Sequence, residues 1–149
     1  MHPVFRDLFS NRPLISAVAA WAIAQTAKMV LFSVLERRFY WRRLIDTGGL
    51  PSAHSAFVTG LATGIFFAEG PRSSAFAIAV VFAGVVMYDA VSLRREAGKH
   101  ADILNELLLM TIIRDAFRER EALKELLGHT PVEVLAGAAL GMAVGFLLQ

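Results

Sequence analysis

Four long apolar runs dominate the pattern of hydrophobic and polar positions along the chain. They cover residues 14–35, 53–68, 73–93 and 132–148. A helix rises about 1.5 Å per residue and needs roughly 20 residues to cross about 30 Å of hydrocarbon, so each run approaches the length of a transmembrane helix. The pattern predicts an all-α integral membrane bundle of about four transmembrane helices, which forms a single membrane domain over residues 1–149.

A polar segment, residues 94–131, separates the third and fourth runs. Inside it lies an apolar patch of 11 residues, 103–113, with charged residues on both sides. Such a patch is too short to cross a bilayer and is typical of a helix that lies in the membrane interface. We expect a cytoplasmic amphipathic helix here. The turn "AEGPRS" between the second and third runs is so short that these two helices must be antiparallel neighbours.

The composition supports a membrane protein and excludes several other classes. The hydrophobic fraction is 56% and the charged fraction 19%, which lies outside the range of an ordinary soluble domain. The chain has no cysteine, so it has neither a disulfide framework nor a thiolate metal site. The formal net charge of +2 is too small to indicate a nucleic-acid partner. We expect membrane lipids as the surroundings and no nucleic-acid partner.

The distribution of lysine and arginine predicts the orientation, because cytoplasmic loops retain positive charge. The segment after the first run has four such residues and the segment after the third has seven. The N-terminal tail has two, the short turn has one, and the C-terminal end has none. This alternation predicts a multi-pass protein of the bacterial cytoplasmic membrane with both chain ends outside and both long polar segments in the cytoplasm.

The predicted topology brings several ionisable residues to the cytoplasmic side. His54 lies at the start of the second predicted helix and His129 directly before the fourth. Asp89, Arg94 and Arg95 lie at the end of the third. We therefore expect these five side chains to converge at one depth, at the cytoplasmic interface.

Lys28 lies inside the first apolar run, about 10 Å below the same interface by helix rise. A lysine in hydrocarbon costs about 2.5 to 3.5 kcal/mol on insertion scales, so it should snorkel or face a polar cavity. Gln25 is three residues earlier and therefore lies on the same helix face. The two residues predict a polar patch on the first helix.

Glycines recur at intervals of four in two of the predicted helices. The fourth helix has Gly137, Gly141 and Gly145, and the second has Gly60 and Gly64. This spacing lines one helix face and lets two backbones approach closely. If the two glycine faces meet, the histidines at the two helix starts come within reach of a common ligand. The alternative is that the glycines serve only packing or homo-oligomer formation.

Helix starts with nearby cations favour the binding of an anion such as phosphate. A helix start offers free backbone N–H groups and the positive end of the helix dipole. Ser52 can donate its hydroxyl to a phosphate oxygen, or it can simply cap the helix. The candidate substrate-binding residues are Lys28, Ser52, Asp89, Arg94, Arg95 and Lys124.

His129 is a candidate nucleophile on phosphorus if its ring is neutral and a carboxylate holds the second ring nitrogen. Glu133, four residues on, has the required reach. "TPVE" is also a capping box, in which Thr130 caps the helix, Pro131 opens it and Glu133 reaches back to the cap N–H. Both interpretations of Glu133 stay open from the sequence.

Several motifs together resemble a known superfamily. "PSAHS" and the downstream "GHTPVEVLAGAALG" resemble the type 2 phosphatidic acid phosphatases, which include vanadium haloperoxidases and carry the motifs K-x-x-x-x-x-x-R-P, P-S-G-H and S-R-x-x-x-x-x-H-x-x-x-D. "GGLPSAHSA", "YDAVSLRREAGKHADILNELL" and "LKELLGHTPVEVLAGAALG" more closely resemble the divergent bacterial and plastid branch, over roughly residues 25–141.

The resemblance implies catalytic roles for three residues. His129 matches the nucleophilic histidine, Glu133 stands where the orienting aspartate would be, and His54 matches the general acid that protonates the leaving oxygen. Ser52 and Lys28 match phosphate-binding positions.

The chain also departs from the superfamily motifs at several positions. Ala53 replaces the glycine of P-S-G-H, no R-P follows Lys28 at the expected distance, and Lys124 stands in place of the arginine of S-R. By charge and location, Arg94 and Arg95 are candidates to replace the missing arginines.

The sequence and the resemblance together predict an enzyme. We expect a membrane phosphatase that needs neither metal nor cofactor and hydrolyses a lipid phosphate or isoprenoid diphosphate through a phosphohistidine intermediate. The first alternative is an inactive or regulatory membrane module that retains the phosphatase-like fold. The second is a metal-dependent hydrolase whose ligands would be drawn from His54, Asp89, His100, Asp102 and His129.

Overall fold

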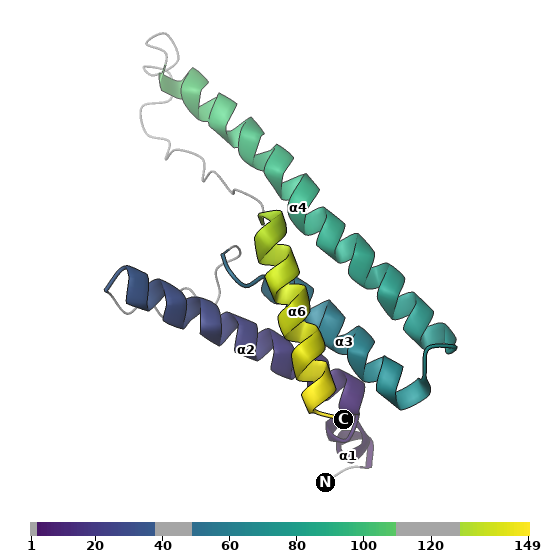
Figure 1. The fold of residues 1–149 in the computed structure, drawn as a ribbon. Coiled ribbons are helices and arrows are strands. Elements are labelled where there is room, and N and C mark those ends of the chain that lie inside the picture. Colours follow the sequence, from purple (N-terminus) through teal and green to yellow (C-terminus); the bar gives the residue numbers. More distant parts are fainter. Residues whose placement is uncertain (1–2, 38–48, 110–128) are drawn as a thin grey trace.

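A computed structural model describes residues 3–37, 49–109 and 129–149, and every regular element in these residues is a helix. Figure 1 shows the arrangement of the helices. They are α1 (Pro3–Phe9), α2 (Arg12–Leu35), α3 (Ala53–Glu69), α4 (Ser74–Leu109) and α6 (Pro131–Leu147). The predicted all-α bundle is thereby confirmed.

Side-chain caps determine where three of the helices begin. The Asn11 side chain accepts a hydrogen bond from the backbone N–H of Leu14 at the start of α2. The Ser52 hydroxyl caps α3, and Thr130 with Glu133 forms a complete capping box at the start of α6. These caps satisfy backbone donors that the first helical turn leaves without partners.

Helix α3 lies at the centre of the bundle and contacts α2, α4 and α6. Helices α2 and α6 also contact each other, whereas α4 packs mainly on α3. In Figure 1, α3 and α4 run in opposite directions from the turn that joins them, which confirms that they are antiparallel neighbours. This arrangement places the starts of α3 and α6 side by side, next to the middle of α4.

Small side chains fill the interior of the bundle, and large apolar side chains cover its surface. Ala20, Ala24 and Ala56 are 0% exposed, while Val81 and Leu135 are more than two-thirds exposed, at 67% and 68%. In water this distribution would be unfavourable. In a bilayer it is expected, because lipid tails are as apolar as leucine and close packing of small residues drives helices together.

The glycines of α6 pack against α3. A Cβ on Gly137 would overlap the carbonyl oxygen of Ser52, and a Cβ on Gly141 would overlap the Thr59 hydroxyl and the Ala56 carbonyl oxygen. No side chain fits at these two positions unless the helices move apart. The α6 glycines therefore serve close packing between two helices of the same chain.

The glycines of α3 face a different neighbour. A Cβ on Gly60 would lie 2.9 Å from the Ala20 Cβ, and a Cβ on Gly64 would lie 2.6 Å from the Pro13 Cα, both on α2. The condition that the two glycine faces meet is fulfilled only in part: the α6 glycines pack on α3, and a Cβ on Gly145 would lie 3.2 Å from the Gly60 carbonyl oxygen, but the Cβ positions of Gly60 and Gly64 point to α2. Helix α3 uses one face for α2 and another for α6, because a central helix needs a close-packing surface on each side. A homo-oligomer stays a prediction.

We expect Gly141→Ala to destabilise the bundle and Gly84→Ala to leave it intact. The Gly141 methyl group would force α6 away from α3, and overpacking of this kind costs about 1 to 3 kcal/mol. A Cβ at Gly84 on α4 meets nothing within 4 Å, and alanine favours the helix more than glycine does. Unfolding of both variants in detergent, followed by circular dichroism, measures the difference. Equal midpoints would contradict the close-packing role of Gly141.

Within the residues that the structure describes, two helices are long and apolar enough to cross a membrane: Arg12–Leu35 and the Ser74–Ser92 part of α4. The shorter helix Pro131–Leu147 is also apolar. The number of crossings and their sidedness stay predictions.

Helix α4 differs from the expectation at its far end. It continues without a break to Leu109, so the part of the predicted amphipathic helix before residue 110 belongs to α4, and the rest lies outside the described residues. Arginine, glutamate, alanine and lysine continue the helix there because they are good helix formers. Loss of hydropathy after residue 93 therefore does not mark the end of the helix.

Candidate active site at the starts of α3 and α6

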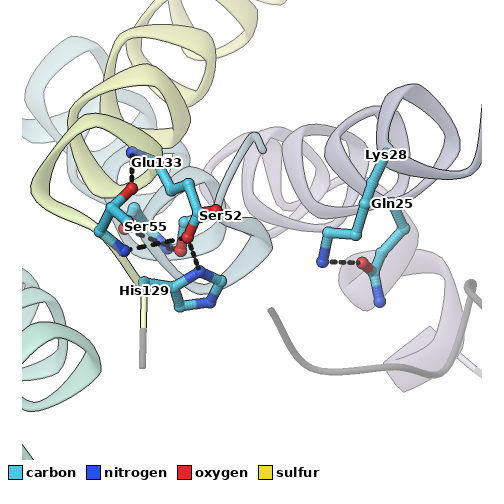
Figure 2. A network of polar contacts seen from close by, with 7 residues as sticks. Gln25, Lys28, Ser52, Ser55, His129 and Glu133 are labelled. Carbon is cyan, nitrogen blue, oxygen red and sulfur yellow. Dashed lines mark hydrogen bonds and ion pairs between the residues drawn. The ribbon is translucent and has the colours of Figure 1, made fainter. Parts of the chain in front are cut away.

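His129 lies directly before α6 and is held from two sides. Its backbone N–H donates to the carbonyl oxygen of Ala90 on α4, at 3.1 Å. Its ring Nδ1 lies 3.0 Å from Glu133 Oε2, and Figure 2 draws this contact as a dashed line. The side chain is 0% exposed. Both the position and the ring orientation of His129 are thereby fixed.

Glu133 both caps α6 and holds His129. The same oxygen, Oε2, accepts from the backbone N–H of Thr130 at 3.0 Å and contacts His129 Nδ1. The Thr130 hydroxyl accepts from the Glu133 backbone N–H at 3.3 Å. The two interpretations of Glu133 are therefore compatible, since one carboxylate oxygen makes both contacts.

The contact with Glu133 determines which ring nitrogen of His129 is suited to nucleophilic attack. An ionised carboxylate only accepts hydrogen bonds, so Nδ1 carries the hydrogen. In a neutral imidazole the lone pair is then on Nε2. This is the tautomer that a histidine nucleophile needs if it is to attack through Nε2.

Ser52 joins the starts of α3 and α6 through its backbone and caps α3 with its side chain. Its backbone N–H donates to the carbonyl oxygen of Glu133 at 3.0 Å. Its hydroxyl oxygen accepts from the Ser55 hydroxyl at 3.1 Å and from the Ser55 N–H at 3.4 Å. Ser52 is 0% exposed. The capping role is thus present, and the phosphate contact stays a prediction.

His54 lies in the first turn of α3 and faces the ring of His129. The two ring centroids are 6.0 Å apart and the ring planes are inclined by 68°. His54 is exposed, whereas His129 is buried. The structure therefore brings the two predicted catalytic histidines together, with one ring fixed inside the bundle and the other open to a ligand.

Lys28 and Gln25 form a buried pair on α2. The Lys28 Nζ donates to Gln25 Oε1 at 2.8 Å, and Lys28 is only 5% exposed. Gly49, at φ 89°, lies against the lysine stem: a Cβ there would be 3.5 Å from Lys28 Cγ. In Figure 2 this pair lies apart from the side chains of His129 and Glu133. The polar patch on α2 is present, and it is separate from His129 and Glu133.

The predicted site residues of α4 lie near His129 along the helix. Asp89 is exposed and directly precedes Ala90, whose carbonyl oxygen accepts from His129. Arg94 and Arg95 follow within α4, but their side chains lie outside the described part of the chain, as does Lys124 entirely. Their predicted contacts with substrate stay predictions.

Sequence reasoning missed Thr59 and Ser55 as parts of this site's support. The Thr59 hydroxyl donates to the Ser55 carbonyl oxygen at 2.7 Å and lies 3.1 Å from the carbonyl oxygen of Ala138 on α6. The four-residue spacing of Ser55 and Thr59 on an otherwise apolar helix was the available signal, because such residues form hydrogen bonds across membrane helices. Thr59 thereby links α3 to α6, and Ser55 supports the cap formed by Ser52.

The alternative of a metal-dependent hydrolase needs a group of ligands. Within residues 3–37, 49–109 and 129–149, no three histidine, cysteine or carboxylate side chains are placed to share a metal ion. His100 and Asp102 lie on α4 beyond the histidine cluster and are exposed. This alternative therefore has no ligand set among the described residues.

The fold and this group of residues define a class of protein: an all-α membrane bundle with a carboxylate-held histidine and a second histidine at adjoining helix starts. The sequence model of the Divergent PAP2 family matches residues 9–144, and the chain belongs to that family. The resemblance seen in the motifs is thereby confirmed.

A relative from Bacillus subtilis (strain 168) supports the membrane assignment. That protein, named Uncharacterized membrane protein YuiD, is 38% identical over 152 residues, which cover 95% of this chain and 96% of the relative. No solved structure matches the chain. Family and relative together describe a phosphatase-related membrane protein.

Proposed function

We propose that this protein hydrolyses the phosphate ester or diphosphate of a membrane amphiphile through a phosphohistidine intermediate on His129, without a metal ion. The observation that carries the proposal is the contact of His129 Nδ1 with Glu133 beside the facing ring of His54. Membership of the Divergent PAP2 family supports the same class of reaction.

The first chemical step forms a bond between His129 Nε2 and phosphorus and breaks the bond between phosphorus and the leaving oxygen. Protonated His54 gives its proton to that oxygen, so the leaving group departs as a neutral hydroxyl or an acid phosphate. Glu133 stabilises the positive charge that develops on the His129 ring.

The second step regenerates the enzyme. A water molecule attacks phosphorus, neutral His54 accepts a proton from that water, and the bond between phosphorus and Nε2 breaks. Inorganic phosphate leaves and both histidines return to their starting states. Because water supplies both the oxygen and the proton, the reaction balances without an oxidant or cofactor.

An amphiphilic substrate fits the depth of the site. His54 and His129 lie at helix starts, where a helical membrane bundle meets the headgroup layer, so a phosphate there is accessible on a lipid. Lys28, Ser52, Asp89, Arg94, Arg95 and Lys124 are the proposed substrate-binding residues. By the distribution of positive charge, we place the site on the cytoplasmic side.

Release of inorganic phosphate by the purified protein tests this proposal. In detergent, with a panel of lipid phosphates and isoprenoid diphosphates, we expect phosphate release from at least one amphiphile and the same rate when a chelator removes divalent metals. No release from any member of the panel would favour the regulatory module that retains only the fold. Loss of release after chelation would favour metal-dependent hydrolysis.

A further inference from the structure

An apolar cavity opens beside His54, on the side of α3 away from α6. Its volume is about 380 Å³, and residues of α2, α3 and α4 line it. The lining residues are Trp21, His54, Phe57, Val58, Phe82 and Val86. We call this cavity the tail groove. Apart from His54, its walls are aromatic or aliphatic, so they favour hydrocarbon over any polar ligand.

The tail groove is continuous with the candidate active site through one side chain. His54 lines the groove and also faces the ring of His129 at a centroid distance of 6.0 Å. Phe57 and Val58 follow three and four residues after His54, on the same face of α3. A molecule whose phosphate lies between the two histidines therefore has the groove directly next to its leaving oxygen.

A second, larger cavity has no such connection. It has a volume of about 560 Å³ and lies between α3, α4 and α6, with Phe66, Phe76 and Phe146 among its walls. Neither histidine lines it. A third cavity, of about 760 Å³ along α2, is larger still, and neither histidine lines it. Volume alone would favour these two cavities, but a lipid tail must be covalently continuous with the phosphate that reacts. The tail groove is smaller, but it is the cavity that adjoins His54 and therefore the reacting phosphate, so we favour it.

We propose that the tail groove holds the hydrocarbon segment nearest the phosphate of a single-chain lipid phosphate. The proposal rests on the proposed function for the position of the phosphate. Four residues of helix, from His54 to Val58, rise only about 6 Å, so the groove holds the first carbons and the remaining chain lies in the bilayer. One groove next to His54 accommodates one chain.

Shape rather than hydrophobicity gives the groove its selectivity. Lipid tails are as apolar as the groove walls, so transfer of a chain from bilayer to groove gains little from the hydrophobic effect. The gain comes from close contact with Trp21, Phe57 and Phe82. A side chain that fills the groove should therefore exclude the chain and leave substrates without a chain unaffected.

Two tryptophan substitutions on α4 test the proposal. Val86→Trp fills the tail groove, and the matched control Gly84→Trp projects into the larger cavity, where a Cβ at residue 84 meets nothing within 4 Å. The substrates are hexadecyl phosphate, which has one long chain, and phenyl phosphate, which has none. The measured quantity is the ratio of their kcat/KM values.

We expect Val86→Trp to lower the hexadecyl to phenyl ratio about tenfold or more, a discrimination typical of steric exclusion from an apolar pocket. Gly84→Trp should leave the ratio unchanged. Equal ratios in the two variants, or a lowered ratio only in Gly84→Trp, would overturn the proposal.

A binding measurement on the wild-type protein separates this proposal from the proposed function. A hexadecyl phosphate with a photoreactive diazirine on its third carbon should label Phe57 or Phe82, as mapped by mass spectrometry. Labelling there without any phosphate release would support the groove and contradict the hydrolase. Labelling confined to the walls of the larger cavity would reject the groove, whatever the protein hydrolyses.

Discussion

Replacing His129 with alanine is expected to abolish phosphate release from every substrate. The substitution removes the nitrogen that attacks phosphorus, and loss of a nucleophile in a comparable catalytic triad lowers kcat by about 10⁶-fold. His129 is buried and its backbone N–H reaches Ala90 on α4. The backbone bond survives the substitution, so circular dichroism in detergent should show an intact bundle without turnover.

Substitutions of Glu133 and Thr130, compared in the same experiment, distinguish a catalytic role of Glu133 from a role in capping α6. Glu133→Gln keeps an acceptor for the capping box but removes the charge beside Nδ1, and the corresponding change in a serine protease triad costs up to about 10⁴-fold. Thr130→Ala removes the cap hydroxyl and leaves the Glu133 carboxylate, so it should cost about 1 kcal/mol of stability and little turnover.

The same two variants would contradict a catalytic role if Glu133 only caps α6. In that case Glu133→Gln would keep full activity, and any loss would follow stability in both variants alike. Phosphate release and unfolding midpoints, measured on the same preparations, distinguish the two roles.

Replacing His54 with alanine is expected to slow poor leaving groups far more than good ones. General acid catalysis contributes about 10² to 10⁴-fold, so alkyl phosphates should lose turnover within that range. An activated aryl phosphate needs little help from a proton and should lose much less. The comparison of the two substrates, with chemistry rate-limiting, measures the proton transfer itself.

The same variant should change the dependence of activity on pH. With the first step limiting, wild-type activity falls at low pH because His129 becomes protonated and at high pH because His54 loses its proton. His54→Ala should therefore lose the decline at high pH and keep the decline at low pH. Equal losses for both leaving groups, or an unchanged pH profile, would assign His54 to structure.

The starts of α3 and α6 were predictable from local sequence. The predicted runs 53–68 and 132–148 differ from Ala53–Glu69 and Pro131–Leu147 by one residue at most. Ser52 as the cap of α3, and Thr130 with Pro131 at α6, are start signals that act within one turn. The end of α4 was not predictable in this way, because hydropathy reports the surroundings of a helix and not its length.

The candidate site was predictable where it depends on neighbouring residues and unpredictable where it depends on how helices cross. The contacts of Glu133 with His129 and of Lys28 with Gln25 follow from helix spacing. The separation of Lys28 from His129 depends on how α2 crosses α3, and close contacts such as that of Gly60 with Ala20 set that crossing. No periodicity in the sequence specifies which glycine meets which helix.

The two faces of α6 differ strongly in how well they tolerate substitution. The face with the glycines tolerates very little, and the outer face tolerates much more. Gly137 and Gly141 have no space for even a methyl group, whereas Leu135 and Met142 are exposed on the outside of the bundle. Any apolar residue of similar helix propensity serves at such outward positions, since lipid adapts to its shape. Random drift can therefore rewrite the outer face of α6 extensively while the two histidines keep their separation, because the constraint lies on the inward face, where the glycines allow no larger side chain.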